Sequence, residues 1–106
     1  MNSRKYIACL CLCYAASVAA QTLVYLEHSE TLSFDQERIA NAQILRGNVI
    51  FRHEDALMYC DSAYFYDQEN SLDAFGHVRF EQGDTLKGYG DKLFYDGNTK
   101  LARLRR

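Results

Sequence analysis

The sequence predicts an all-β fold, an antiparallel meander of repeated hairpins. The segment 47–51 (GNVIF) recurs 29 residues later as 76–80 (GHVRF), and 65–67 (FYD) recurs as 94–96. Val, Ile, Tyr and Phe are frequent in runs bounded by turn residues, whereas helical periodicity is hard to find. Such recurrence is typical of stacked supersecondary units, because no single copy buries its own apolar face.

The first 20 residues have the layout of a cleavable secretory signal. A basic start at Arg4 and Lys5 precedes an apolar stretch over residues 6–16 and small residues at 18–20. The apolar stretch is too short to span a bilayer comfortably. We therefore expect a signal peptide over residues 1–20 and one exported domain over residues 21–106.

The exported part is small and has few means of covalent stabilisation. Removing 20 of the 106 residues leaves 86, and Cys60 is then the single cysteine, so no internal disulfide forms. Ten of the 12 Lys and Arg remain, against 14 Asp and Glu. The part is therefore modestly acidic and has no basic stripe of the kind that binds nucleic acid. The basic residues near the end of the chain suit either a solvated tail or an anionic partner.

We expect five consecutive strands, near residues 43–53, 56–66, 71–81, 85–95 and 99–106. Turn residues separate them, and the short connections make them antiparallel neighbours. The strongest turn signal is the pair Asp96-Gly97, because Gly readily supplies the positive φ that tight hairpins need.

The residues before the first long strand form a shorter, degenerate copy of the unit. Segments 23–26 and 31–34 have strand composition, as expected of a capping repeat. Residues 35–41 are expected to form a loop or a helical turn.

Two of the strands show a clear inner face. Leu72, Ala74, Gly76, Val78 and Phe80 fall on one side of the segment, and the other side is polar apart from Phe75, which indicates a half-buried strand. One repeat earlier, Leu45, Gly47, Val49 and Phe51 likewise share one face, and Ile50 is the exception on the other. In 57–66 and 86–95 apolar residues stand at both odd and even positions, which would face opposite sides of a regular strand. This pattern indicates a bulge or burial on both sides and leaves the inner face unassigned.

The edges of this sheet lack the usual protection. The chain has no proline, so charge must blunt the edge strands. The last strand runs to Arg106 with no turn signal after it. Either the chain is a fragment of a longer array, or this edge accepts a strand from another molecule by β-augmentation.

Five runs of residues resemble a known family. They are 47–52 (GNVIFR), 59–64 (YCDSAY), 74–78 (AFGHV), 83–86 (GDTL) and 95–102 (YDGNTKLA). In this order they resemble the OstA-like (LptA) family of periplasmic lipopolysaccharide-transport proteins, to which the N-terminal periplasmic part of LptD also belongs.

The resemblance implies a V-shaped β-jelly roll whose apolar interior is open along its length. It implies a periplasmic module that binds lipopolysaccharide or another amphipathic lipid. Like proteins would join end to end by strand pairing and so connect the envelope membranes. The chain has roughly half the strands of a full family domain, which predicts an incomplete roll.

Nine apolar residues are expected to line the interior and contact lipid. An acyl chain of about a dozen methylenes, at about 0.8 kcal/mol each, needs such an apolar sleeve to cross water. These residues are Val49, Phe51, Leu57, Phe65, Leu72, Val78, Phe80, Leu86 and Phe94. The alternative from the residues alone is a closed core, because apolar strand faces usually pack on one another.

Catalysis is not expected. Asp55, Asp67, Asp84 and Asp96 all fall in turns, where Asp is favoured for bonding its own backbone. The three histidines, at 28, 53 and 77, lack the close spacing of zinc ligands, and no phosphate-cradling loop is present. We therefore expect no metal and no cofactor.

A carbohydrate-binding surface is the serious competitor. The chain has 8 Tyr, and aromatic rings stack on sugars. The candidates are Tyr59, Tyr64, Tyr66, Tyr89 and Tyr95. Tyrosine also suits partly wet strand positions, so a secreted glycan-binding module and a purely structural module both stay open.

Overall fold

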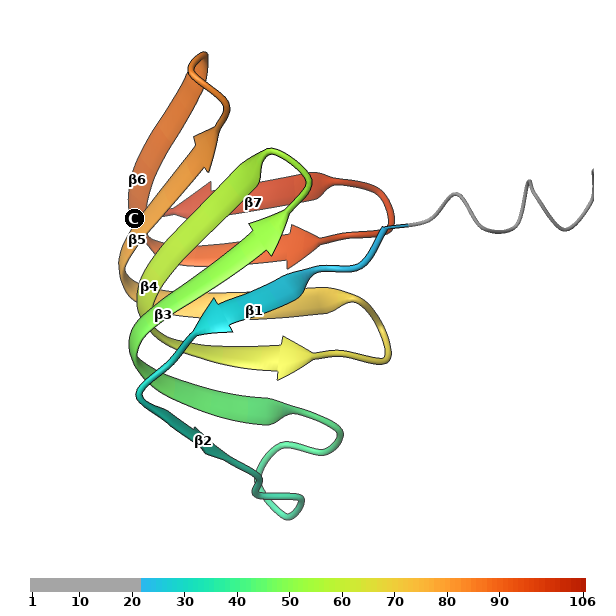
Figure 1. Ribbon diagram of the computed structural model, residues 1–106. Helices are drawn as coiled ribbons and strands as arrows, with labels where there is room; N and C mark the ends of the chain where they lie inside the picture. The colour runs from blue at the N-terminus through green and yellow to red at the C-terminus, as the bar shows by residue number, and fades with distance from the viewer. Residues whose placement is uncertain (1–21) are drawn as a thin grey trace, which may run out of the picture.

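The computed structural model describes residues 22–106, which form one antiparallel sheet of seven strands. The strands are β1 (Tyr25–His28), β2 (Thr31–Ser33), β3 (Gln43–His53), β4 (Ala56–Tyr66), β5 (Ser71–Gln82), β6 (Leu86–Asp96) and β7 (Leu101–Arg105). The expected signal peptide lies outside the described residues. The all-β prediction is confirmed, and the sheet does not close into a barrel (Figure 1).

The strand order also follows the prediction. Strands β3 to β7 form a meander in which each strand pairs with the next. The short strands β1 and β2 both pair with β3, at its two ends, and so act as one interrupted edge strand. Residues 35–41 form turns between β2 and β3, as expected.

The long strands bend near their middle, so that the sheet folds over on itself (Figure 1). At this corner the ladder between neighbouring strands shifts register. In β3 the two corner residues have positive φ, 86° at Gly47 and 47° at Asn48. In β5 the same pair recurs at Gly76 (80°) and His77 (47°). The repeated GN and GH pairs of the sequence are therefore β-bulges, which bend a strand and increase its twist.

A carboxylate from a neighbouring segment lies over each bulge: Asp61 of β4 over one, and Glu30, between β1 and β2, over the other. Asp61 Oδ2 is 2.6 Å from His77 Nδ1, and this hydrogen bond raises the pKa of the His77 ring. Asn48 Nδ2 donates to Glu30 Oε2 at 2.5 Å in the same way. A Cβ on Gly76 would stand 2.7 Å from Asp61 Oδ2, so the carboxylate occupies space that only Gly leaves free.

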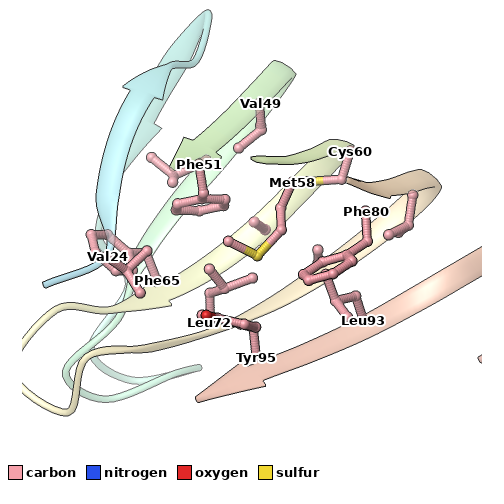
Figure 2. Packing of buried hydrophobic residues seen from close by; sticks show 14 of the residues in the cluster. Val24, Val49, Phe51, Met58, Cys60, Phe65, Leu72, Phe80, Leu93 and Tyr95 are labelled. Carbon is pink, nitrogen blue, oxygen red and sulfur yellow. The ribbon is translucent and has the colours of Figure 1, made fainter. Parts of the chain in front are cut away.

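The bend creates two arms whose inner faces oppose each other. The upper arm contains β1 and residues 49–60 and 78–90, and the lower arm contains β2 and residues 43–46, 62–75 and 92–105. Aromatic pairs join the arms: the ring centroids of Phe51 and Phe65 are 5.2 Å apart, and those of Phe80 and Tyr95 are 6.1 Å apart. Figure 2 shows these side chains converging between the arms.

The inner face changes parity within β4, which is why periodicity alone left it unassigned. Upstream of the corner the buried residues of β4 are even-numbered, and downstream they are odd-numbered. They are Ala56, Met58 and Cys60, then Ala63 and Phe65. Asp61 and Ser62 lie between the two sets at the corner. The expected bulge is therefore present, and Leu57 lies on the outer face rather than inside, paired with Arg52 and Glu81.

Strand β6 is displaced by one residue relative to the sequence repeat. The turn before β6 contains three residues, 83–85, whereas the turn before β4 contains two, 54 and 55. As a result Leu72 pairs with Phe65 on one side and with Tyr95 on the other. Tyr95 is buried, and Phe94 lies half-buried on the outer face, opposite to the expectation.

The corner predicts a position-specific effect of substitution on stability. In Gly76→Ala the alanine would have to adopt the positive φ of 80°, which is strained for a residue with a Cβ. Its Cβ would also lie 2.7 Å from Asp61 Oδ2, which is too close. We expect the free energy of unfolding to fall by about 1–3 kcal/mol, measured by urea denaturation.

Gly83→Asn is the matched control for this substitution. Gly83 also has a positive φ, of 55°, but its nearest neighbour is 3.6 Å away, and Asn tolerates this backbone region. An equal loss of stability in both variants would contradict the account of the corner.

Candidate functional site

The interior between the arms collects most of the residues predicted to line it. Val49, Phe51, Phe65, Leu72, Val78 and Phe80 are all buried in one apolar cluster. Val49, Phe51, Val78 and Phe80 share the inner face of the upper arm, as the sequence indicated. Met58, Leu93 and Tyr95 belong to the same cluster and were not predicted.

This interior, which we call the trough, is filled by its own side chains in this conformation. Val49, Phe51 and Leu72 have no exposed surface. The middle of the trough is therefore a closed apolar core in this conformation.

The two ends of the trough differ from its middle, because apolar inner-face side chains are exposed there. At the β2 end Leu32, paired with the buried Leu45, is 48% exposed. At the other end Leu86, on the inner parity of β6, is 51% exposed, and Leu104 of β7 is 37% exposed. Apolar surface therefore continues to both edges of the sheet.

The mouth of the trough, where the tips of the arms meet, is closed by polar groups. The Thr22 hydroxyl donates to Glu54 Oε2 at 2.6 Å. Because this bond uses the hydroxyl proton, the same oxygen accepts a hydrogen bond from His53 Nε2, 3.0 Å away. The other ring nitrogen, His53 Nδ1, then accepts from the Tyr95 hydroxyl at 2.6 Å. Lys100 Nζ extends this network by donating to Glu54 Oε1 at 2.9 Å. The chain of bonds runs from the lower arm to the upper arm and back.

Charge and burial fit this arrangement. The hydrogen bonds from Thr22 and Lys100 lower the pKa of the Glu54 carboxyl, which therefore stays ionised and accepts both bonds. Burial raises the pKa of the Tyr95 hydroxyl, which keeps its proton for His53. His53, the last residue of β3, is 2% exposed.

The segment Thr22–Val24, which we call the strap, crosses the mouth beside this network. The Val24 N–H donates to Asn70 Oδ1 at 2.6 Å, and Asn70 Nδ2 donates to the Thr22 carbonyl at 3.1 Å. These two bonds imitate those that a neighbouring strand would make. The Val24 side chain is buried and points toward Phe65 inside the trough (Figure 2).

The turn at residues 97–100 supports the strap by close approach. Gly97 was expected to supply a positive φ, and this is wrong: positive φ occurs at Asn70 (57°) and Lys100 (61°). Gly97 N–H donates to the Asn70 carbonyl at 2.8 Å, and a Cβ there would lie 2.7 Å from Val24 Cγ2. Gly is therefore needed at this position for space.

A hollow of about 610 Å³ lies on the outer face next to the corner. Its rim includes Tyr59 and Tyr89, and the Arg79 guanidinium lies 3.9 Å from the centroid of the Tyr59 ring. Tyr89 is 62% exposed. Four of the five candidate sugar-stacking tyrosines are on the outer face, whereas Tyr95 is inside.

Residues 22–106 show neither a cluster of metal ligands nor a membrane-spanning helix. This part of the chain contains no group of three or more His, Cys, Asp and Glu that is close enough to hold a metal ion. It also contains no helix of the length and hydropathy needed to cross a membrane. Of the turn aspartates, Asp55, Asp67 and Asp84 are exposed and Asp96 is half-buried.

Comparison with known proteins identifies the family. The family model for the OstA-like protein matches residues 21–106, which include every strand of the sheet. The chain belongs to the OstA-like family. The match links the folded sheet to a family of transport and binding proteins, as the resemblance implied. No curated protein and no solved structure matches this OstA-like chain.

The packing of the OstA-like trough predicts an unreactive thiol. Burial is the main cause that raises the pKa of Cys60 to about 12. At pH 8 the thiolate fraction should be roughly a hundredfold or more below that of an unfolded chain. We expect correspondingly slow reaction with a disulfide reagent, measured in a variant with Cys9, Cys11 and Cys13 replaced by Ser. Equal rates with and without urea would contradict the packing.

Proposed function

We propose that this protein is a non-catalytic periplasmic module that binds the acyl chains of lipopolysaccharide or a similar amphipathic lipid and takes part in its transport. Membership of the OstA-like family supports an envelope transport role. The observation that carries the proposal is the apolar trough, a continuous inner face formed by both arms of one folded sheet.

Lipid binding in this trough requires the arms to separate. The interior side chains touch across the fold, as the Phe51–Phe65 pair shows. Burial of about a dozen methylenes contributes roughly 10 kcal/mol of transfer free energy. This gain offsets the free-energy cost of separating the apolar side chains of the two arms. An acyl chain would thus replace one apolar surface by another.

Photocrosslinking tests the proposal. With p-benzoylphenylalanine in place of Phe51 or Phe80, we expect adducts with lipopolysaccharide on irradiation, because both positions face the trough. The readout is the mass of the adduct by gel shift and mass spectrometry.

Tyr89 is the matched control, since it lies on the outer face and is exposed. Adducts at Phe51 and Phe80 with none at Tyr89 support the trough. No adduct at either interior position in a folded protein would refute it.

We further propose that like proteins extend the trough end to end by strand pairing. The supporting features are the apolar inner-face residues exposed at both edges, Leu32 at one and Leu86 and Leu104 at the other. Edge strands with unpaired backbone groups are templates for pairing with another chain. Envelope membranes would then be reached through partners.

A charged side chain at the β2 edge should weaken this assembly. We expect Leu32→Lys to raise the dissociation constant of self-association by about tenfold or more, because the charge would be buried in the extended trough. Sedimentation velocity over a range of concentrations measures it. Ser33→Lys, on the opposite face of the same strand, should have little effect, and equal effects would argue against trough continuity.

A glycan-binding function is the second candidate, because the outer hollow combines Tyr59, Tyr89 and Arg79. Aromatic rings beside a guanidinium suit a sugar ring with anionic substituents. Crosslinks to lipopolysaccharide at Tyr89 alone would favour this function over the trough.

A further inference from the structure

We infer that the strap, Thr22–Val24, is a closure of the trough that must release before an acyl chain enters. The inference rests on the proposed lipid-binding function and adds to it the segment that controls access. It follows from where the strap lies, what it touches and how it is bonded.

The strap lies at the mouth, where it is bonded to the tips of both arms. On the upper arm it meets the tip of the β3–β4 hairpin through His53 and Glu54. On the lower arm it meets Asn70, in the turn between β4 and β5. A segment that bonds to both tips opposes their separation, because separation breaks the bonds on one side.

The strap also fills space that an acyl chain would need. Val24 is 6% exposed and belongs to the same apolar cluster as Phe65 and Leu72. Its neighbour Leu23 is 72% exposed. The segment therefore inserts one apolar side chain into the mouth and turns the next one away, as a reversible plug would.

The bonds of the strap are suited to release as a unit. Apart from the packing of Val24, the strap is held by hydrogen bonds to side chains, and strand pairing to β3 begins only at Tyr25. Thr22 is hydrogen-bonded to both His53 and Glu54, so its departure breaks the chain of bonds at the mouth in its middle. The direct Tyr95–His53 and Lys100–Glu54 bonds then hold the arms with less support.

The variant that tests the inference is Thr22→Val, which removes the hydroxyl and keeps the size of the side chain. The Val24 N–H, which donates to Asn70, reports release through hydrogen exchange. Loss of the hydroxyl bonds from Thr22 to His53 and Glu54 should accelerate this exchange about fivefold to tenfold. Asn70→Gly, which keeps the positive φ and removes the amide, is the second variant.

The functional readout is the association rate of a fluorescent dodecanoic acid, followed by stopped flow. In the wild type we expect the rate to level off at high probe concentration, because opening becomes limiting. The plateau should rise about fivefold to tenfold in Thr22→Val. Thr22→Ser should behave as the wild type, and Leu23→Ser, in the same segment but facing solvent, should also be unchanged.

The outcomes separate this inference from the proposed function. Faster exchange and faster association together support the strap as the closure. Faster exchange with unchanged association, in a protein that binds the probe, overturns the strap and leaves lipid binding intact. Unchanged exchange in Thr22→Val also overturns it. Failure of the wild type and both folded variants to bind the probe or lipopolysaccharide overturns the proposed function itself.

Discussion

The bend across the long strands is the constraint on which the rest of this structure depends. Without it, the sheet would be a flat meander with one apolar face in water, which a chain of this size cannot tolerate. The bend brings the two halves of that face together, so that the sheet buries its own apolar surface. It is produced by a local device, a Gly with positive φ and a carboxylate in the space above it.

The device explains why the repeat is so visible in the sequence. Gly47 and Gly76 recur because each corner needs the same backbone conformation, and Val and Phe follow because the inner face resumes at once. Strand limits were predicted to within two residues for all five long or terminal strands, since alternation and turn residues are local signals. The inner face of β5 was predicted for the same reason.

Other features depend on tertiary packing that no local pattern records. One additional residue in the turn at 83–85 displaces β6, so Phe94 matches Phe65 in sequence yet faces the other way. The mouth was missed because its partners are far apart in the chain: His53 and Tyr95 are separated by 42 positions, and Val24 and Asn70 by 46. Asn70 was an ordinary turn residue by composition, and the repeat gives no signal for it, because Thr99 stands 29 residues later.

The trough is filled by its own side chains, yet the chain belongs to a transport family. Both findings fit a protein with two states, a closed one, which this structure shows, and an open one with separated arms. The arms are joined by apolar packing and by polar bonds at the mouth, and the proposed function requires an acyl chain to replace the first and the second to release. The most direct test is the distance between spin labels at Asp55 and Gln68, which are exposed at the tips of opposite arms, measured by pulsed electron resonance. The account predicts a longer distance when lipopolysaccharide binds; an unchanged distance with bound lipid would contradict it.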